Sequence, residues 1–216
     1  MTLELLGSVG LGLGLAAACG LRVFVPLLVM SLATRLGVVT PGESFAWLGS
    51  WPALVALSTA CGMELAGYYL PWVDHLLDTV ATPMATIAGA IVAGAAMVGV
   101  GAADGLPPIL QWAAPLLAGG GMATTVQLGT VAMRGVSTMT TGGVGNPVVA
   151  TVENASSLVL SVLAVVVPVL AAVIVFATVI VVGRFAVRRV RGRCRRAAAL
   201  TPVAATSIPC AASAMV

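Results

Sequence analysis

Five long apolar segments, separated by short polar stretches, make up most of this chain. They cover roughly residues 5–33, 52–70, 83–103, 109–133 and 155–183. A helix needs about 20 apolar residues to cross the hydrocarbon core of a bilayer, and each segment is close to that length or longer. Because lipid offers no hydrogen bonds, a spanning segment must satisfy its own backbone, as an α-helix does. The sequence therefore predicts an all-α, polytopic transmembrane helix bundle of about five spans.

The composition supports a membrane protein and argues against an enzyme. Hydrophobic residues make up 60% of the chain and charged residues 8%, whereas charged residues make up about 25% of an average soluble domain. The four cysteines show no spacing typical of zinc sites or disulfide frameworks. The chain has one histidine and no recognisable pair of nucleophile and base. We therefore expect a non-enzymatic protein without a cofactor.

Positive charge is concentrated near the C-terminus. All ten basic residues are arginines, and seven follow the last apolar segment: Arg184, Arg188, Arg189, Arg191, Arg193, Arg195 and Arg196. A basic cluster directly after a membrane helix indicates the cytoplasmic end of that helix. We expect a transmembrane domain over 1–190, a basic and then disordered cytoplasmic tail over 191–216, and, from the odd number of spans, an external N-terminus. Anionic lipid headgroups are candidate partners of the tail, and nucleic acid is not.

The stretch between the fourth and fifth apolar segments is polar. Residues 134–154 read RGVSTMTTGGVGNPVVATVEN. Glycine and proline in this density interrupt a helix, and irregular backbone at membrane depth must be buried in protein or line a wet cavity. We therefore predict a polar re-entrant hairpin that enters the membrane between Ser137 and Pro147, the alternative being a tightly packed loop without a ligand. Its candidate substrate-binding residues are Arg134, Thr138, Thr141, Asn146, Glu153 and Asn154.

Two charged residues lie within the first two apolar segments. Arg22 is near the middle of the first segment, and Glu64 is within the second. A charge at this depth is costly and nearly always faces a partner or water. We therefore expect Arg22 to pair with Glu64, either as a structural lock between two helices or as a binding or gating pair.

A second acidic group follows the second apolar segment, in YYLPWVDHLLDTVATP (residues 68–83). On a helix, Asp74 and Asp78 are four residues apart and share a face. Their like charges repel, and water or a cation relieves the repulsion. The pair is therefore either a solvated face or a site that attracts cations, where oxygen ligands suit Mg²⁺ or Ca²⁺ better than zinc.

Small residues and tryptophans indicate how the spans pack and where they end. Gly10 and Gly14 are four residues apart, a spacing that lets helices approach closely in membranes. Residues 36–51 read as an interfacial connector in which Trp47 and Trp51 anchor at the headgroups.

Four motifs together resemble a family of bacterial polytopic membrane proteins catalogued as domain of unknown function 4126. They are ACGLRVFVP (18–26), FAWLGSWPAL (45–54), YYLPWVDHLLDTVATP (68–83) and STMTTGGVGNPVVATVEN (137–154). The resemblance covers roughly residues 12–185. It implies a small multi-pass protein of the bacterial cytoplasmic (inner) membrane, and it transfers no activity.

Three functional hypotheses follow from these features. The first is a small transporter or channel with a polar site between the 134–154 hairpin and the Arg22/Glu64 region, where a surplus of acids favours a cation or a proton-coupled solute. The second is a lipid-binding or lipid-flipping protein in which Arg22 and Arg134 hold a phosphate headgroup. The third is a structural membrane protein without a substrate. A homo-oligomer is a candidate assembly for each.

Overall fold

The structure is a computed structural model, and it describes residues 2–67, 71–98, 107–171, 173–181, 184 and 188, with the side chains of 2–4, 71–79 and 108 left aside. In chain order the elements are α1 (Thr2–Cys19), α2 (Phe24–Arg35), the 3-10 helix η1 (Glu43–Gly49), α3 (Trp51–Gly67), α4 (Pro71–Val98), α5 (Pro108–Pro115), the π-helix η2 (Leu116–Gly120), α6 (Gly121–Thr141) and α7 (Asn146–Val166). Residues 168–171 and 173–181 are also helical. No strand occurs within these ranges, so the all-α prediction is confirmed.

The chain divides into two compact units, Met1–Val175 and Phe176–Val216. The first unit contains all the labelled helices. In the second unit, residues 176–181 are helical, and Arg184 and Arg188 are exposed. The other five arginines of the basic cluster lie outside the described residues, and the predicted domain boundary near residue 190 stays a prediction.

Three helices in the described ranges are long and apolar enough to cross a membrane, so the chain is a polytopic membrane protein. They are Val80–Val98, Ile109–Thr141 and Asn146–Val166. The pair η1 and α3, bent by 65°, gives a fourth if it counts as one span. The structure differs from the predicted five spans because the first and last apolar segments are broken. The last one breaks at Val167, whose backbone leaves the helical region (φ −137°, ψ 72°).

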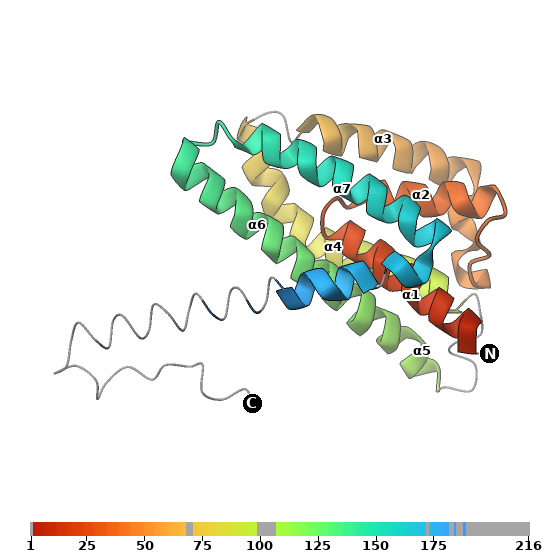
Figure 1. The fold of residues 1–216 in the computed structure, drawn as a ribbon. Helices are drawn as coiled ribbons and strands as arrows, with labels where there is room; N and C mark the ends of the chain where they lie inside the picture. The colour runs from red at the N-terminus through yellow and green to blue at the C-terminus, as the bar shows by residue number, and fades with distance from the viewer. Residues whose placement is uncertain are drawn as a thin grey trace. The chain divides into compact units, whose positions relative to one another are not determined.

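The first apolar segment is a hairpin of two short helices, whose tip we define as residues 20–23. Figure 1 shows α1 running from the N-terminus to the middle of the first unit and α2 running back from there. Gly20, Arg22 and Val23 at the tip are buried. Pro26 lies in the first turn of α2, where its missing amide hydrogen leaves no helical hydrogen bond unmade. The first apolar segment therefore reverses direction at the tip and does not form one continuous helix.

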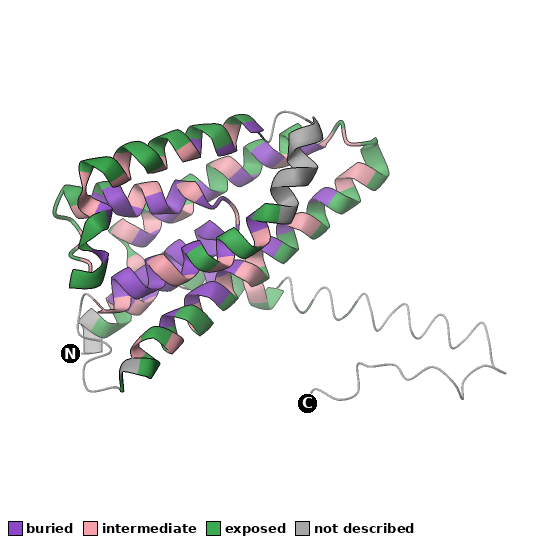
Figure 2. Ribbon diagram, turned by 180° about the vertical axis from the view of Figure 1, so that it is seen from behind, coloured by how far each residue is buried: buried purple, intermediate pink, exposed green. Residues whose placement is uncertain are grey.

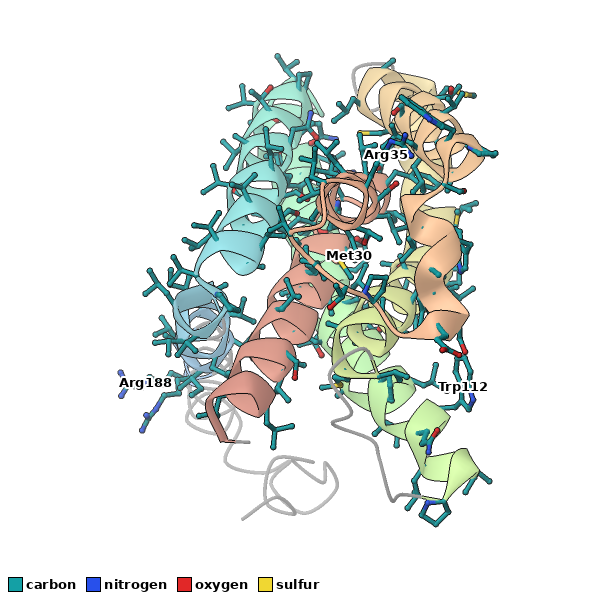
Figure 3. The ribbon with its side chains drawn as sticks, turned by 90° about the vertical axis from the view of Figure 1, so that its right-hand side faces the viewer. Met30, Arg35, Trp112 and Arg188 are labelled. Carbon is teal, nitrogen blue, oxygen red and sulfur yellow. The ribbon has the colours of Figure 1, made fainter. Side chains whose placement is uncertain are left out.

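The core surrounds α1, which packs against α4, α7, α2 and α6. Figure 2 shows buried residues along most of α1 and along the inner faces of its neighbours. Met30 on α2 is fully buried against this core (Figure 3). The outer faces of α3 and α7 carry exposed apolar side chains such as Met63 and Val159, which is the arrangement expected of helices that face lipid.

Small residues allow close packing around α1, as predicted for Gly10 and Gly14. A Cβ atom at Gly10 would lie 2.6 Å from the carbonyl oxygen of Pro168, and one at Gly14 would lie 2.9 Å from the Cβ atom of Ala164. Both distances are too short for a side chain, so the α1 backbone needs glycine at these two positions.

A second close approach joins α4 to η2. A Cβ atom at Gly89 would lie 2.7 Å from the carbonyl oxygen of Gly119, and one at Gly119 would lie 2.4 Å from the carbonyl oxygen of Gly89. The two helices therefore meet here backbone to backbone.

The predicted interfacial connector contains η1. The side chains of Trp47 and Trp51 are exposed, and the guanidinium carbon of Arg35 lies 3.8 Å from the centre of the Trp51 ring. Phe45 contacts Trp112 of α5, with ring centres 5.8 Å apart. The exposed tryptophans fit the predicted role as headgroup anchors, which stays a prediction.

Candidate functional site

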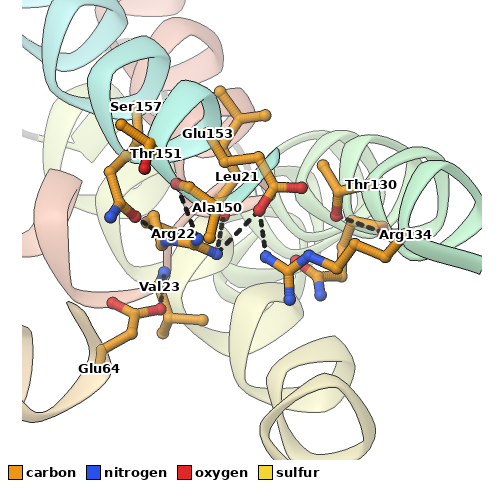
Figure 4. Close-up of polar contacts among 12 residues, drawn as sticks. Leu21, Arg22, Val23, Glu64, Thr130, Arg134, Ala150, Thr151, Glu153 and Ser157 are labelled. Atoms are coloured by element: carbon orange, nitrogen blue, oxygen red, sulfur yellow. Dashed lines mark hydrogen bonds and ion pairs between the residues drawn. The ribbon is translucent and has the colours of Figure 1, made fainter. Parts of the chain in front are cut away.

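Four charged side chains from four parts of the fold are buried in the first unit. They are Arg22 at the tip, Glu64 on α3, Arg134 on α6 and Glu153 on α7, and none is more than 5% exposed. Charged side chains are almost never buried to this extent unless they are paired. We call these four residues the buried charge cluster, and Figure 4 shows it in close-up.

Arg22 is bound mainly by α7. Its Nη1 atom lies 3.0 Å from Oε2 of Glu153, its Nη2 atom donates to the carbonyl of Ala150 at 3.1 Å, and its Nε atom donates to Oδ1 of Asn154. The prediction that Arg22 is paired is confirmed. The predicted partner was wrong, because among the described residues Arg22 forms its ion pair with Glu153, while Glu64 binds backbone amides.

Glu64 instead binds the N-terminus of α2. Its Oε1 atom accepts a hydrogen bond from the amide of Val23 at 2.8 Å, and its Oε2 atom accepts one from the amide of Phe24 at 3.0 Å. The first amides of a helix have no partners within the helix and carry a partial positive charge. The Glu64 carboxylate from α3 accepts hydrogen bonds from these amides and offsets their partial positive charge. Glu64 therefore binds the backbone at the end of the tip, while Glu153 binds the Arg22 side chain.

Glu153 joins three parts of the fold through one oxygen atom. Besides Arg22, Nη2 of Arg134 donates to the same Oε2 atom (Figure 4). The tip, α6 and α7 therefore meet at this carboxylate. Its other oxygen, Oε1, is buried and has no hydrogen-bond partner in the part of the chain that the structure describes.

The buried face of α7 is polar over most of the helix. Its buried residues include Asn146, Glu153, Ser157 and Ser161, whereas most of the exposed side chains on the opposite face are apolar. Ser157 Oγ donates to the carbonyl of Ala18 in α1 at 3.1 Å. With a rise of about 1.5 Å per residue, this polar face extends for roughly 22 Å.

The buried face of α6 is also polar, and it includes Gln127, Thr130 and Arg134. Sequence reasoning missed four of these buried residues on the two helices: Gln127, Thr130, Ser157 and Ser161. The signal for them was present, because they recur every three or four residues with Arg134 and Glu153 inside otherwise apolar segments.

The irregular backbone predicted from Ser137 to Pro147 was wrong in extent, since α6 continues to Thr141 and α7 starts at Asn146. Threonine and serine stabilise the helix ends here. Thr141 Oγ1 donates to the carbonyl of Ser137 at 2.8 Å and accepts from the amide of Gly145 at 3.0 Å. Gly142 ends α6 in the left-handed conformation (φ 64°). The turn is thus confined to residues 142–145, between two candidate spans.

The remaining predicted site residues on this segment lie at the turn. Asn146 Nδ2 donates to Thr138 Oγ1 at 3.2 Å, and the Thr141 side chain is exposed. Asn146 precedes Glu153 by about two helical turns, or roughly 10 Å along the axis. The structure therefore separates Thr138, Thr141 and Asn146 from the buried charge cluster.

Asp74 and Asp78 lie four residues apart on α4, so the helical spacing predicted for them is present. Their side chains are outside the described part of the structure, and their predicted role as a cation site stays a prediction. Among the described residues, no group of three or more histidine, cysteine or acidic side chains is arranged to hold a metal ion.

Comparison with known proteins identifies the family of the chain. The family model described as "Domain of unknown function (DUF4126)" matches residues 9–188. No curated protein and no solved structure matches the chain. The match covers most of the sequence, so the chain belongs to this family, and the resemblance carried by the four motifs is confirmed.

Proposed function

We propose that this member of the DUF4126 family is a small integral membrane transporter or channel, without enzymatic activity, in which a polar solute moves along the buried faces of α6 and α7. The observation that carries the proposal is the inverted polarity of α7. Four of its polar residues, Asn146, Glu153, Ser157 and Ser161, are buried, while Val152, Val159 and Val166 are exposed. Lipid does not require a polar interior, and intramembrane polar residues commonly mark a solute pathway.

The tip of the α1–α2 hairpin supports the same proposal. Transporters commonly bind their substrates where helices are discontinuous near the middle of the membrane. Here the break brings Arg22 against α7 and leaves two helix-terminal amides without partners inside the helix, and Glu64 binds both of them. The tip is thus a place where small shifts of one helix pair would change the contacts of several charges.

The charge balance of the buried charge cluster bears on whether the solute is a cation. The preference for a cation or for proton coupling came from the acid surplus that includes Asp74 and Asp78. Within the buried charge cluster, two arginines face two glutamates, so the acid surplus does not extend to it. Binding of a cation or coupling to protons would therefore depend on Asp74 and Asp78 and not on the buried charge cluster.

Lipid binding is the less favoured alternative. Arg22 and Arg134 would have to exchange Glu153 for a phosphate headgroup, and both side chains are almost fully enclosed. A purely structural role would leave the polar faces of α6 and α7 without a purpose beyond packing.

A flux assay with a matched pair of serines tests the proposed pathway. Ser161 on the buried face of α7 and Ser58 on the exposed face of α3 each donate to the carbonyl four residues earlier. In proteoliposomes, we expect Ser161→Ala to lower the flux of a transported solute about two- to tenfold, the range that follows from loss of one hydrogen bond. Ser58→Ala should leave the flux unchanged. Absence of flux for every ion and small polar solute tested would contradict the proposal.

The hairpin also changes the expected topology. The external N-terminus was expected from five complete crossings, whereas an α1–α2 hairpin that enters and returns places the N-terminus and Arg35 on one side. We propose a bacterial cytoplasmic membrane, with that side and the arginine-rich C-terminus both in the cytoplasm. In a variant without the native cysteines, Thr2→Cys and Val38→Cys should react with an impermeant thiol reagent from the same side, and a reporter after Arg196 should read cytoplasmic. Labelling of the two cysteines from opposite sides would contradict the re-entrant hairpin.

A further inference from the structure

We infer that Oε1 of Glu153 binds a small neutral molecule that donates a hydrogen bond, so that the pathway admits uncharged hydroxyl or amide solutes and excludes ions. The inference rests on the proposed function and specifies its solute. It begins with an atom that the fold leaves without a partner. Glu153 is 5% exposed, and while its Oε2 atom contacts two guanidinium groups, its Oε1 atom has no hydrogen-bond partner among the described residues.

A buried acceptor such as Oε1 of Glu153 is stabilised by a hydrogen-bond donor. Nearly all buried side-chain oxygen atoms in proteins accept at least one hydrogen bond, and a carboxylate oxygen can accept about two. A molecule that donates an O–H or N–H group to Oε1 would satisfy this atom without disturbing the contacts of Oε2.

Hydroxyl groups on the buried faces of α6 and α7 would also bind a hydrogen-bond donor. Thr130 Oγ1 donates to the carbonyl of Gln127 at 2.9 Å, Ser157 Oγ donates to Ala18, and Ser161 Oγ donates to the carbonyl of Ser157 at 2.6 Å. A hydroxyl group has one hydrogen to donate, so each of these oxygens offers only its acceptor lone pairs to a guest. The buried faces of α6 and α7 therefore present a series of acceptors, which suits a guest rich in donors.

The charges of the cluster exclude an ionic guest. A cation at Oε1 would be close to the guanidinium groups of Arg22 and Arg134, and an anion would be repelled by the Glu153 carboxylate. Among the described residues, the charges of Arg22 and Arg134 are matched by those of Glu153 and Glu64, so an added cation or anion would place an uncompensated charge in a buried site, which is strongly unfavourable. A neutral donor adds no charge.

Flux measurements with neutral and charged probes test the inference. We expect proteoliposomes that contain the full chain to take up glycerol and urea faster than empty liposomes, and to pass K⁺ and Cl⁻ no faster. Thr130→Val removes one acceptor with little change in shape, and should lower glycerol and urea flux about two- to tenfold. The matched control is Thr125→Val, because Thr125 makes a similar bond to Gly121 on the exposed face of α6. Glu153→Gln is the second variant, and it should lower the flux of both neutral probes if it folds.

The outcomes separate the inference from the function on which it rests. Passage of K⁺ or Cl⁻ without glycerol or urea would overturn the inference and leave a transporter in place. Equal glycerol flux for the wild type and Thr130→Val would also overturn it. If no probe crosses faster than in empty liposomes, the proposed function fails, and the inference fails with it.

Discussion

Replacing Arg22 by alanine is expected to lower the free energy of unfolding by about 3–5 kcal/mol, the cost of removing one partner from a buried ion pair. Arg22 is 1% exposed and contacts Glu153, Asn154 and the carbonyl of Ala150. Its removal leaves three acceptors of α7 without this donor and detaches the tip from that helix. The measurement is the thermal unfolding midpoint in detergent micelles, with Arg188→Ala, at an exposed position, as the control.

A double-mutant cycle then identifies the partner of Arg22. We expect Arg22→Ala and Glu153→Ala together to be less harmful than the sum of the single changes, because each removes one side of the same contact. The cycle with Glu64→Ala should give a smaller coupling energy. A larger coupling with Glu64 would contradict the pairing in the structure and restore the pair expected from sequence.

Replacing Glu64 by alanine is expected to have the second largest effect. Each hydrogen bond to a charged group contributes about 1.5–3 kcal/mol, and Glu64 accepts two such bonds from the amides of Val23 and Phe24. We therefore expect a loss of at least about 3 kcal/mol, and a smaller loss for Glu64→Gln, whose amide keeps one acceptor oxygen. Met63→Ala is the matched control, because Met63 is the neighbouring residue on α3 and is 72% exposed.

Hydrogen exchange distinguishes this role from a general effect on packing. In Glu64→Ala, the amides of Val23 and Phe24 should lose protection more than amides in the middle of α1. Unchanged protection of these two amides would show that Glu64 does not cap α2 in solution.

The sequence alone predicted the class of fold because composition and segment length are enough for it. Apolar segments of sufficient length must become helices in lipid. Arg22 and Glu64 could be recognised as unusual by their depth within such segments, and Arg134 and Glu153 by their place in the polar stretch between two of them.

 The depth of a charge along its segment can be read from sequence, and the direction in which its side chain points cannot.

Because the direction of a side chain cannot be read from sequence, the partners of these four charges could not be predicted. Glu64 lies within an apolar segment and Glu153 just before one, and sequence offers no physical ground for knowing which of the two faces Arg22. The choice depends on the reversal of the chain at the tip, which turns the amides of Val23 and Phe24 toward α3 and the guanidinium of Arg22 toward α7.

The turn between α6 and α7 is shorter than predicted, because the glycines interrupt the helix over residues 142–145 and not over the whole polar stretch. Thr138, Thr140 and Thr141 lie within α6, and hydroxyls such as that of Thr141 bond to the carbonyl of the preceding turn. Only Gly142 and Gly143 adopt positive φ angles there. A helix therefore persisted to the glycines, and the polar spacing of three and four residues was the better guide.

The backbone contact between Gly89 and Gly119 has a consequence for how this protein could change over evolution. No side chain separates α4 from η2 at that point, so no substitution there can widen or narrow the interior without pushing the two helices apart. Under the proposed function, differences in solute size between related chains should therefore arise on the inner faces of α6 and α7, where a side chain can be exchanged while the helix axes stay in place.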